Sequence, residues 1–214
     1  MRNKNIIILV LSAFICLSST NIHHYTVKRI YDGDTILLFN GDKVRYIGID
    51  APEIDYKNGI NEYMALQSRN MNTNLVYNKD IYLEFDIEKR DRYGRLLAYA
   101  FHQNGDMVNN TLLKHGLAWI MAIPPNLRHF SVFLESQRYA ISEKLGLWQK
   151  YTVNTEISYT GNRQSYRFHR PGCPFEKTIS PQNYIHFKTV RDAFWNGFSP
   201  CRECLSKKEL FSLH

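Results

Sequence analysis

The sequence lacks any uninterrupted apolar run of the roughly 18 residues that a membrane-spanning helix needs, and it contains no internal repeat or low-complexity tract. Apolar residues are nevertheless plentiful, since 44% of its 214 residues are hydrophobic and 14% are aromatic, which excludes a disordered chain. Cysteine is scarce: four are present, one of them at position 16, and the odd number that follows cannot all pair within one chain. We therefore expect a soluble, folded protein with one well-buried domain and a small appendage.

The first twenty residues have the three-part pattern of a secretory signal peptide. Arg2 and Lys4 give a basic start, residues 6–17 form an apolar run, and residues 18–20 are small and polar. We expect this segment to be cleaved, so that the mature protein is secreted or periplasmic and has no stable association with a membrane. A buried N-terminal helix or strand is the alternative interpretation.

Charge is distributed unevenly over the rest of the chain. Residues 21–154 carry 16 basic and 15 acidic side chains, whereas residues 155–214 carry 9 basic and 5 acidic ones. A basic tail favours a polyanionic partner, because phosphate contacts supply most of the sequence-independent affinity for nucleic acids. Simple solubility is the other explanation for this charge.

Alternating apolar segments bounded by turn residues dominate the central part of the chain. They predict five short strands, over 25–31, 35–39, 43–49, 81–85 and 96–101. Asn40-Gly41 separates two of them, and this dipeptide is a strong hairpin signal because both residues tolerate positive φ. Periodic apolar residues predict three helices, one starting at residue 61, one over 109–116 and one over 126–144.

This order of elements predicts an α+β fold that is mainly β, a five-stranded OB-fold-like barrel with packed helices. Barrels of this oligonucleotide-binding kind often bind nucleic acids on a curved face. The predicted domains are a signal peptide (1–20), the barrel domain (21–150), a polar linker (151–162) and a small C-terminal module (163–214).

Carboxylates gather in the turns next to the predicted strands. Asp34 and Asp50 each fall at a strand edge, where both side chains and the Ala51 carbonyl could converge on one hard divalent cation. Such an open coordination sphere keeps room for water and lets the ion polarise a phosphoryl oxygen. Glu53, three residues beyond Asp50, is the candidate base or orienting group for an attacking water.

Arg45 and Arg95 complete a candidate phosphoryl-transfer site, because a guanidinium offers paired donors that match phosphate oxygens. Each string also has a purely structural interpretation. Asp-Gly-Asp at 32–34 is a common turn, Asp-Ala-Pro-Glu at 50–53 can cap a helix, and the charged stretch 89–95 can be a solvated surface.

Taken together, these strings resemble the thermonuclease family, the staphylococcal-nuclease-like calcium-dependent nucleases. The resemblance covers about residues 25–148 and rests on VKRIYDGDT (27–35), VRYIGIDAPE (44–53), DRYGRLLAY (91–99) and GLW (146–148). It implies Ca²⁺ bound by Asp34, Asp50 and the carbonyl of Ala51, a position where the best-studied members of the family have threonine. It further implies the catalytic residues Arg45, Glu53 and Arg95.

The same resemblance implies endonucleolytic hydrolysis of DNA and RNA with little sequence preference, leaving 3′-phosphate ends. Arg92 and Tyr93 are expected to flank the bound nucleotide, since an aromatic face accepts any base by stacking; core packing is the other role for Tyr93.

A non-catalytic nucleic-acid-binding protein built on the same barrel is the competing function. The carboxylate cluster argues against it, because a binder has no need of acids beside a polyanion. No protein partner is predicted.

The C-terminal tail holds His169-x3-Cys173 and Cys201-x2-Cys204, a four-ligand set with the spacing of a zinc site. A module of about 50 residues has little core of its own, so a structural Zn²⁺ would stabilise it. A Cys201–Cys204 disulfide with Cys173 free is the alternative, which export to an oxidising compartment favours.

The tail also resembles the Ada-type metal-binding module, which normally has cysteine where His169 stands. Four arginines of the tail are candidates for contacts to a nucleic-acid backbone, namely Arg163, Arg167, Arg170 and Arg202.

Overall fold

The computed structural model describes residues 24–149, 157–205 and 210; the predicted signal peptide lies outside these residues. The strands of the first part are β1 (His24–Ile30), β2 (Thr35–Leu38), β3 (Lys43–Tyr46), β4 (Gly48–Asp50), β5 (Asp80–Glu84), β6 (Leu96–His102) and β7 (Trp119–Met121). Its helices are α1 (Ala65–Val76), α2 (Val108–Lys114), α3 (Phe130–Ser142) and the 3₁₀ turn η1 (Gly146–Gln149).

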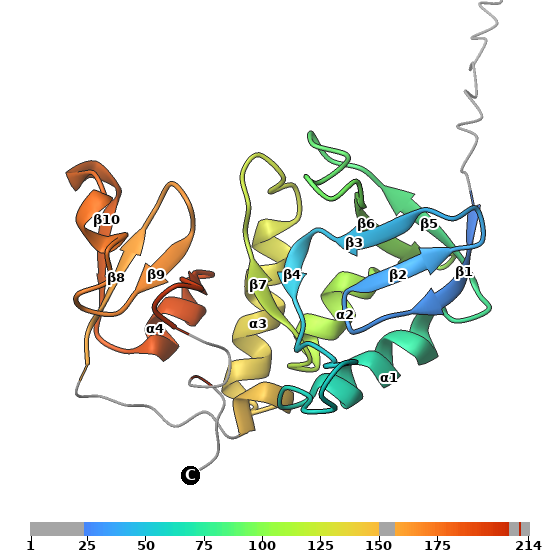
Figure 1. Cartoon of the computed structure of the whole chain (residues 1–214), viewed down its shortest axis with the longest axis horizontal. Coiled ribbons are helices and arrows are strands. Elements are labelled where there is room, and N and C mark those ends of the chain that lie inside the picture. Colours follow the sequence, from blue (N-terminus) through green and yellow to red (C-terminus); the bar gives the residue numbers. More distant parts are fainter. Residues whose placement is uncertain (1–23, 150–156, 206–209, 211–214) are drawn as a thin grey trace, which may run out of the picture.

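Five of these strands close a barrel in the order β1-β2-β3-β6-β5 (Figure 1). The β3–β6 pair is parallel, and the other four neighbouring pairs are antiparallel. The side chains of Val27, Ile36, Val44 and Ile81 are fully buried inside it, as the alternation of apolar residues along the strands predicts. The predicted mainly β, five-stranded barrel with packed helices is therefore confirmed.

A glycine breaks the segment that was predicted as one strand over 43–49. Gly48 has a φ of +78° and a Cβ at this position would lie 2.5 Å from the ring of Phe133, so no larger residue fits. The chain turns there, and β4 leaves the barrel to pair with β7, placing Asp50 opposite Trp119. The strand β7 had no equivalent in the sequence prediction.

Two of the three predicted helices begin later than predicted, for identifiable reasons, whereas α2 begins one residue earlier, at Val108. Helix α1 starts at Ala65, not at residue 61, because Met64 has a left-handed φ of 63°. Helix α3 starts at Phe130 because Asn126 instead exchanges hydrogen bonds of 2.9 and 2.8 Å with the backbone of Glu88. Asn109 lies inside α2, and its side chain ties that helix to the barrel by accepting from Ala100 N.

A second, four-stranded sheet follows, in the order β10-β8-β9-β11. Its elements are β8 (Tyr159–Asn162), β9 (Arg167–His169), β10 (Tyr184–Phe187), β11 (Ser199–Pro200), helix α4 (Val190–Trp195), and the 3₁₀ turns η2 (Glu176–Thr178) and η3 (Pro181–Asn183). Strand β8 occupies the last four residues of the predicted linker, because Tyr159, Thr160 and Gly161 are buried in this sheet. We call residues 157–205 the C-terminal module.

The C-terminal module shares a hydrophobic core with the barrel body. Helix α3 stands between the barrel and the module in Figure 1. The ring of Phe194 in α4 lies 5.1 Å from that of Trp148, 6.5 Å from that of Trp119 and 5.3 Å from that of Phe168. Gln137 in α3 also donates to the carbonyl of Phe194 at 2.5 Å. The module is thus packed onto the body rather than tethered to it.

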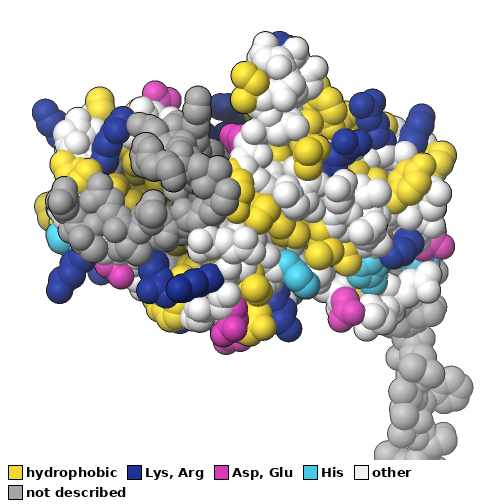
Figure 2. All heavy atoms as spheres, turned by 90° about the horizontal axis from the view of Figure 1, so that it is seen from below, with side chains coloured by type: hydrophobic (Ala, Val, Ile, Leu, Met, Phe, Trp, Pro, Cys, Tyr) yellow, Lys and Arg dark blue, Asp and Glu magenta, His cyan; other side chains and the backbone are white. Residues whose placement is uncertain are grey.

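The surface is of mixed character. On the face in Figure 2, Lys and Arg side chains lie interspersed with hydrophobic and acidic ones. Among the described residues, no helix has the length and apolar character needed to cross a bilayer.

Replacing Phe194 by alanine should strongly destabilise the protein. Its side chain is fully buried between Trp119 and Trp148, so the change removes apolar contacts and leaves a cavity. We expect the free energy of unfolding to fall by about 3–5 kcal/mol, measured by urea denaturation. Phe39→Ala is the matched control, because Phe39 is 64% exposed. Equal stabilities of the two variants would contradict the shared core.

Candidate active site

Asp34 closes the turn between β1 and β2 and is 2% exposed. The turn forms because the side chain of Asp32 accepts a hydrogen bond of 3.0 Å from Asp34 N, a local bond that Asp-Gly-Asp sequences favour. The Asp34 carboxylate accepts from Ala51 N at 2.6 Å and from the Thr35 hydroxyl at 3.0 Å. It is held in one orientation, facing the end of β4.

Arg45 in β3 joins the two predicted cation ligands. Its Nη1 pairs with Asp34 Oδ1, and its Nη2 lies 2.7 Å from Asp50 Oδ1 and donates to the Ile49 carbonyl at 3.2 Å. The Arg45 side chain is 11% exposed and the two carboxylates are nearly fully buried. The structure therefore brings Asp34, Asp50 and Arg45 together at one rim of the barrel.

The donor set at this rim fits a hard divalent cation. Asp34 and Asp50 share one guanidinium and lie next to Ala51, whose N–H is bonded to Asp34. Two carboxylates with an adjacent backbone carbonyl are the oxygen ligands that Ca²⁺ or Mg²⁺ prefers. Residues Asp34, Asp50 and Ala51 are thus the ones that would hold such an ion.

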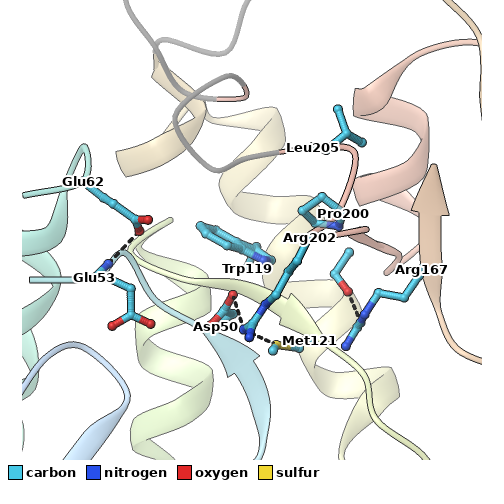
Figure 3. Close-up of a pocket in the computed structure, with 10 residues that line it drawn as sticks. Asp50, Glu53, Glu62, Trp119, Met121, Arg167, Pro200, Arg202 and Leu205 are labelled. Atoms are coloured by element: carbon cyan, nitrogen blue, oxygen red, sulfur yellow. Dashed lines mark hydrogen bonds and ion pairs between the residues drawn. The ribbon is translucent and has the colours of Figure 1, made fainter. Parts of the chain in front are cut away.

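Glu53 lies in the loop after β4, exposed, on the wall of the pocket that also contains Asp50. Its backbone N–H donates to Glu62 Oε2 at 2.7 Å, and Glu62 N donates to the Glu53 carbonyl at 3.2 Å. These two bonds fix the loop, and the Glu53 side chain points away from Glu62 in Figure 3. Glu62 was not among the predicted site residues, because nothing in the sequence marks it as the partner of this loop.

Arg95 lies just before β6, in a second pocket next to β3 that is lined by Lys43, Tyr93 and Arg95. Its Nε donates to Asp91 Oδ2 at 2.7 Å. Burial opposes ionisation of Asp91, but the hydrogen bonds from Arg95 and from two backbone N–H groups outweigh it and hold the pKa of this carboxyl below its usual range. Asp91 thus positions the guanidinium of Arg95.

Arg92 and Tyr93 are at the surface beside Arg95. The Tyr93 ring is 69% exposed, and the guanidinium carbons of Arg92 and Arg95 lie 4.9 and 5.7 Å from its centroid. The competing interpretation of Tyr93 as a core residue is therefore wrong. An exposed ring beside two guanidiniums can stack on a base while the arginines face phosphates.

A metal-ligand cluster lies in the C-terminal module. The ligand atoms of His169, Cys173, Cys201 and Cys204 all lie within 4.8 Å of one another, and all four residues are buried. Tetrahedral zinc with bonds of roughly 2.3 Å to sulfur requires ligand atoms about 3.8 Å apart, so the set fits. The three thiols form no disulfide in the structure.

The protonation chemistry of the cluster also suits a metal. Burial lowers the pKa of His169, so its imidazole is neutral near pH 7 and able to bind through a ring nitrogen. Burial raises the pKa of the Cys204 thiol to about 12. A buried thiol of this kind ionises when a cation replaces its proton.

Two arginines of the C-terminal module reach the barrel site. Arg167 and Arg202 line the same pocket as Asp50 and Glu53, and Arg202 Nη2 lies 3.7 Å from Asp50 Oδ2 (Figure 3). The basic tail made them candidates for backbone contacts, but no sequence signal separates them from Arg163 and Arg170.

Comparison with known proteins agrees with this geometry. A family model described as "Staphylococcal nuclease homologue" matches residues 43–150. The chain is 39% identical over 141 residues to the SPbeta prophage-derived endonuclease YokF of Bacillus subtilis (strain 168), covering 64% of this chain and 47% of that protein. It is 38% identical over 141 residues to endonuclease YncB of the same strain, covering 64% and 66%.

A thermonuclease of Staphylococcus intermedius is 34% identical over 138 residues, with 62% of this chain and 82% of that protein covered. The chain thus spans about half to two thirds of the length of the two Bacillus relatives. The family match ends at residue 150, before the C-terminal module.

Replacing Asp91 by asparagine should lower stability in a pH-dependent way. Because the pKa of folded Asp91 is depressed below 3.8, its contribution is fully present above that pH and is lost as the pH falls through the folded value. We expect a loss of about 1.5 kcal/mol in the free energy of unfolding near neutral pH. Urea denaturation between about pH 7 and pH 3 should show the difference from wild type shrinking below about pH 4. Asp106→Asn, in an exposed turn, is the control; a pH-independent difference would contradict this role.

Proposed function

The chain belongs to the family of staphylococcal nuclease homologues, and from that premise we propose that it is an endonuclease that hydrolyses phosphodiester bonds of DNA and RNA. The observation that carries the proposal is the placement of Asp34, Asp50 and Arg45 at one barrel rim, with Glu53 on the same pocket wall as Asp50. A protein that only bound nucleic acid would gain nothing from buried carboxylates beside a polyanion. Little sequence preference is expected, since the groups assigned to the reaction recognise phosphate.

The proposed chemistry assigns each side chain a task. Glu53, an exposed carboxylate on the pocket wall beside Asp50, orients or deprotonates a water that attacks phosphorus. Arg45 and Arg95 donate paired hydrogen bonds to phosphate oxygens and stabilise the charge that develops on them. Arg92 and Tyr93 contact the neighbouring nucleotide. We expect hydrolysis to leave 3′-phosphate ends, as the resemblance implies.

The proposed metal is Ca²⁺, held by Asp34, Asp50 and the Ala51 carbonyl. A bound ion of this kind would polarise a phosphoryl oxygen and help to orient the attacking water. Loss of the threonine hydroxyl at position 51 is compatible with this proposal, because the backbone carbonyl is the expected ligand.

Export is part of the proposal. A basic, apolar and small-polar order in residues 1–20 supports cleavage of a signal peptide and a secreted or periplasmic location. A non-specific nuclease outside the cytoplasm is also kept away from the DNA and RNA of its own cell.

For the C-terminal module we propose a structural Zn²⁺ bound by His169, Cys173, Cys201 and Cys204, a set that differs from the Ada-type modules in having histidine at position 169. The chemistry of the ligands and their mutual distances support it. The shared core with the barrel supports an accessory role, since the module is packed against the nuclease body.

The nuclease proposal is tested by cleavage of DNA and RNA with and without EGTA. Wild-type protein should lose cleavage when Ca²⁺ is chelated, and Glu53→Gln should lower kcat by about 100-fold or more, because it removes the acid–base group. Glu135→Gln, an exposed carboxylate on α3, is the control and should retain activity. Undiminished cutting by Glu53→Gln, or in EGTA, would reject the mechanism.

The zinc proposal is tested by elemental analysis of freshly purified protein. We expect about one equivalent of zinc, and much less in Cys173→Ser, because one of four ligands is lost. The variant should also unfold at lower temperature, since metal binding is coupled to folding. A zinc content below about half an equivalent in the wild type would favour the Cys201–Cys204 disulfide.

A further inference from the structure

The pocket at the catalytic carboxylates is closed on one side by the C-terminal module. It has a volume of about 300 Å³, with Asp50, Glu53 and Glu62 on the barrel side and Arg167 and Arg202 on the other (Figure 3). The three acidic residues of the pocket belong to the segment that the family model matches, which ends at residue 150. Both basic side chains come from the added module.

Arg202 lies close to Asp50, but its side chain remains exposed to solvent. Its Nη2 lies 3.7 Å from Asp50 Oδ2 and 3.7 Å from Met121 Sδ, and its side chain is 70% exposed. Arg45, in contrast, is 11% exposed and holds both acids at shorter range. A guanidinium has five N–H donors, so Arg202 can contact a phosphate from solvent while it stays beside Asp50.

The position of Arg202 is set by the fold of the module. Cys201 N donates to the Phe168 carbonyl at 2.8 Å and Leu205 N to the Cys201 carbonyl at 3.0 Å, which makes residues 201–205 a tight turn. The cysteines at both ends of this turn, Cys201 and Cys204, belong to the metal-ligand cluster. Arg202 therefore projects from a segment anchored at both ends.

Arg167 has a different role. Its Nη1 donates to Ser199 Oγ within the module and, at 3.4 Å, to the Ala122 carbonyl just after β7. It is largely buried and bridges the module to the body. We regard it as a positioning residue that keeps the turn with Arg202 over the pocket.

We infer that Arg202 binds a phosphate of the nucleic acid substrate next to the catalytic carboxylates, so that the C-terminal module is part of the substrate-binding site. This inference rests on the proposed nuclease function. The phosphate concerned is one beside the scissile bond, because Arg45 and Arg95 are assigned to the scissile group. The ligand is a polynucleotide chain rather than a free nucleotide.

The opposite role, in which Arg202 blocks Asp50 and inhibits the enzyme, is not favoured by the geometry. The contact with Asp50 is long, at 3.7 Å, and the Arg202 side chain is 70% exposed, so this ion pair is too weak to keep a site closed. A guanidinium that meets a phosphate forms paired, charge-assisted bonds, which are stronger. Substrate can therefore displace the weak contact with Asp50.

The test compares Arg202→Ala with Arg191→Ala, a charge-matched change at an exposed arginine of α4 outside the pocket. Arg202→Ala should raise KM for a single-stranded DNA oligonucleotide about tenfold and change kcat less than about twofold. Arg191→Ala should change neither, and Arg202→Lys should restore part of the loss by its charge. Arg202→Gln serves as a second variant should alanine disturb the turn, with zinc content and melting temperature compared in all variants.

A binding measurement separates this inference from the nuclease proposal. In a Glu53→Gln background, fluorescence anisotropy should show that Arg202→Ala raises Kd about tenfold and reduces the slope of log Kd against log salt by about 0.7, the value for one phosphate contact to a single strand. An unchanged Kd and slope would overturn the inference even where cleavage depends on Glu53 and Ca²⁺. Higher kcat in Arg202→Ala would overturn it in favour of inhibition. If the wild-type protein cleaved no nucleic acid but Arg202→Ala still raised Kd as expected, the proposed nuclease function would be rejected and the role of Arg202 in binding would stand.

Discussion

The ion pairs of Arg45 with Asp34 and Asp50 are the constraint on which the site depends. Moving an unpaired carboxylate out of water costs several kcal/mol, so neither buried acid could remain charged without a partner. These three residues come from the turn before β2, from β3 and from the end of β4. Their pairing therefore holds three separate segments of the chain together at one rim of the barrel and keeps both carboxylates aligned before any cation arrives.

The position of Asp50 depends in turn on Gly48. By leaving the barrel at Gly48, β4 carries Asp50 into register with Trp119, whose ring belongs to the core shared with Phe194. The strand that carries Asp50, a candidate cation ligand, is thus packed, through β7, on the C-terminal module. This packing explains why Arg202 of the module can reach Asp50.

Much of the barrel site was predictable because its residues lie at strand ends marked by turn sequences. Asp34 follows the Asp-Gly pair of a turn and Asp50 lies two residues before Pro52, and both signals are local. The break at Gly48 was not predictable, since Gly48 is required by the ring of Phe133, which is distant in sequence. The approach of Arg202 to Asp50 depends on tertiary packing between two modules, for which a single sequence carries no periodic signal. The grouping of His169, Cys173, Cys201 and Cys204 as candidate metal ligands was predictable from their spacing alone.

The three arginines assigned to substrate contacts differ in their exposure to solvent, and we expect their roles to differ accordingly. The exposed fraction of the side chain rises from 11% in Arg45 to 29% in Arg95 and 70% in Arg202, and each pairs with at least one carboxylate. Electrostatic interactions strengthen as water is excluded. The less exposed arginines, Arg45 and Arg95, can therefore strongly stabilise the charge that develops on the phosphate. An exposed guanidinium is screened by salt and contributes mainly to attraction and affinity. We therefore expect the barrel residues to carry out catalysis. The C-terminal module, packed beside the barrel, is expected to increase the affinity for the substrate.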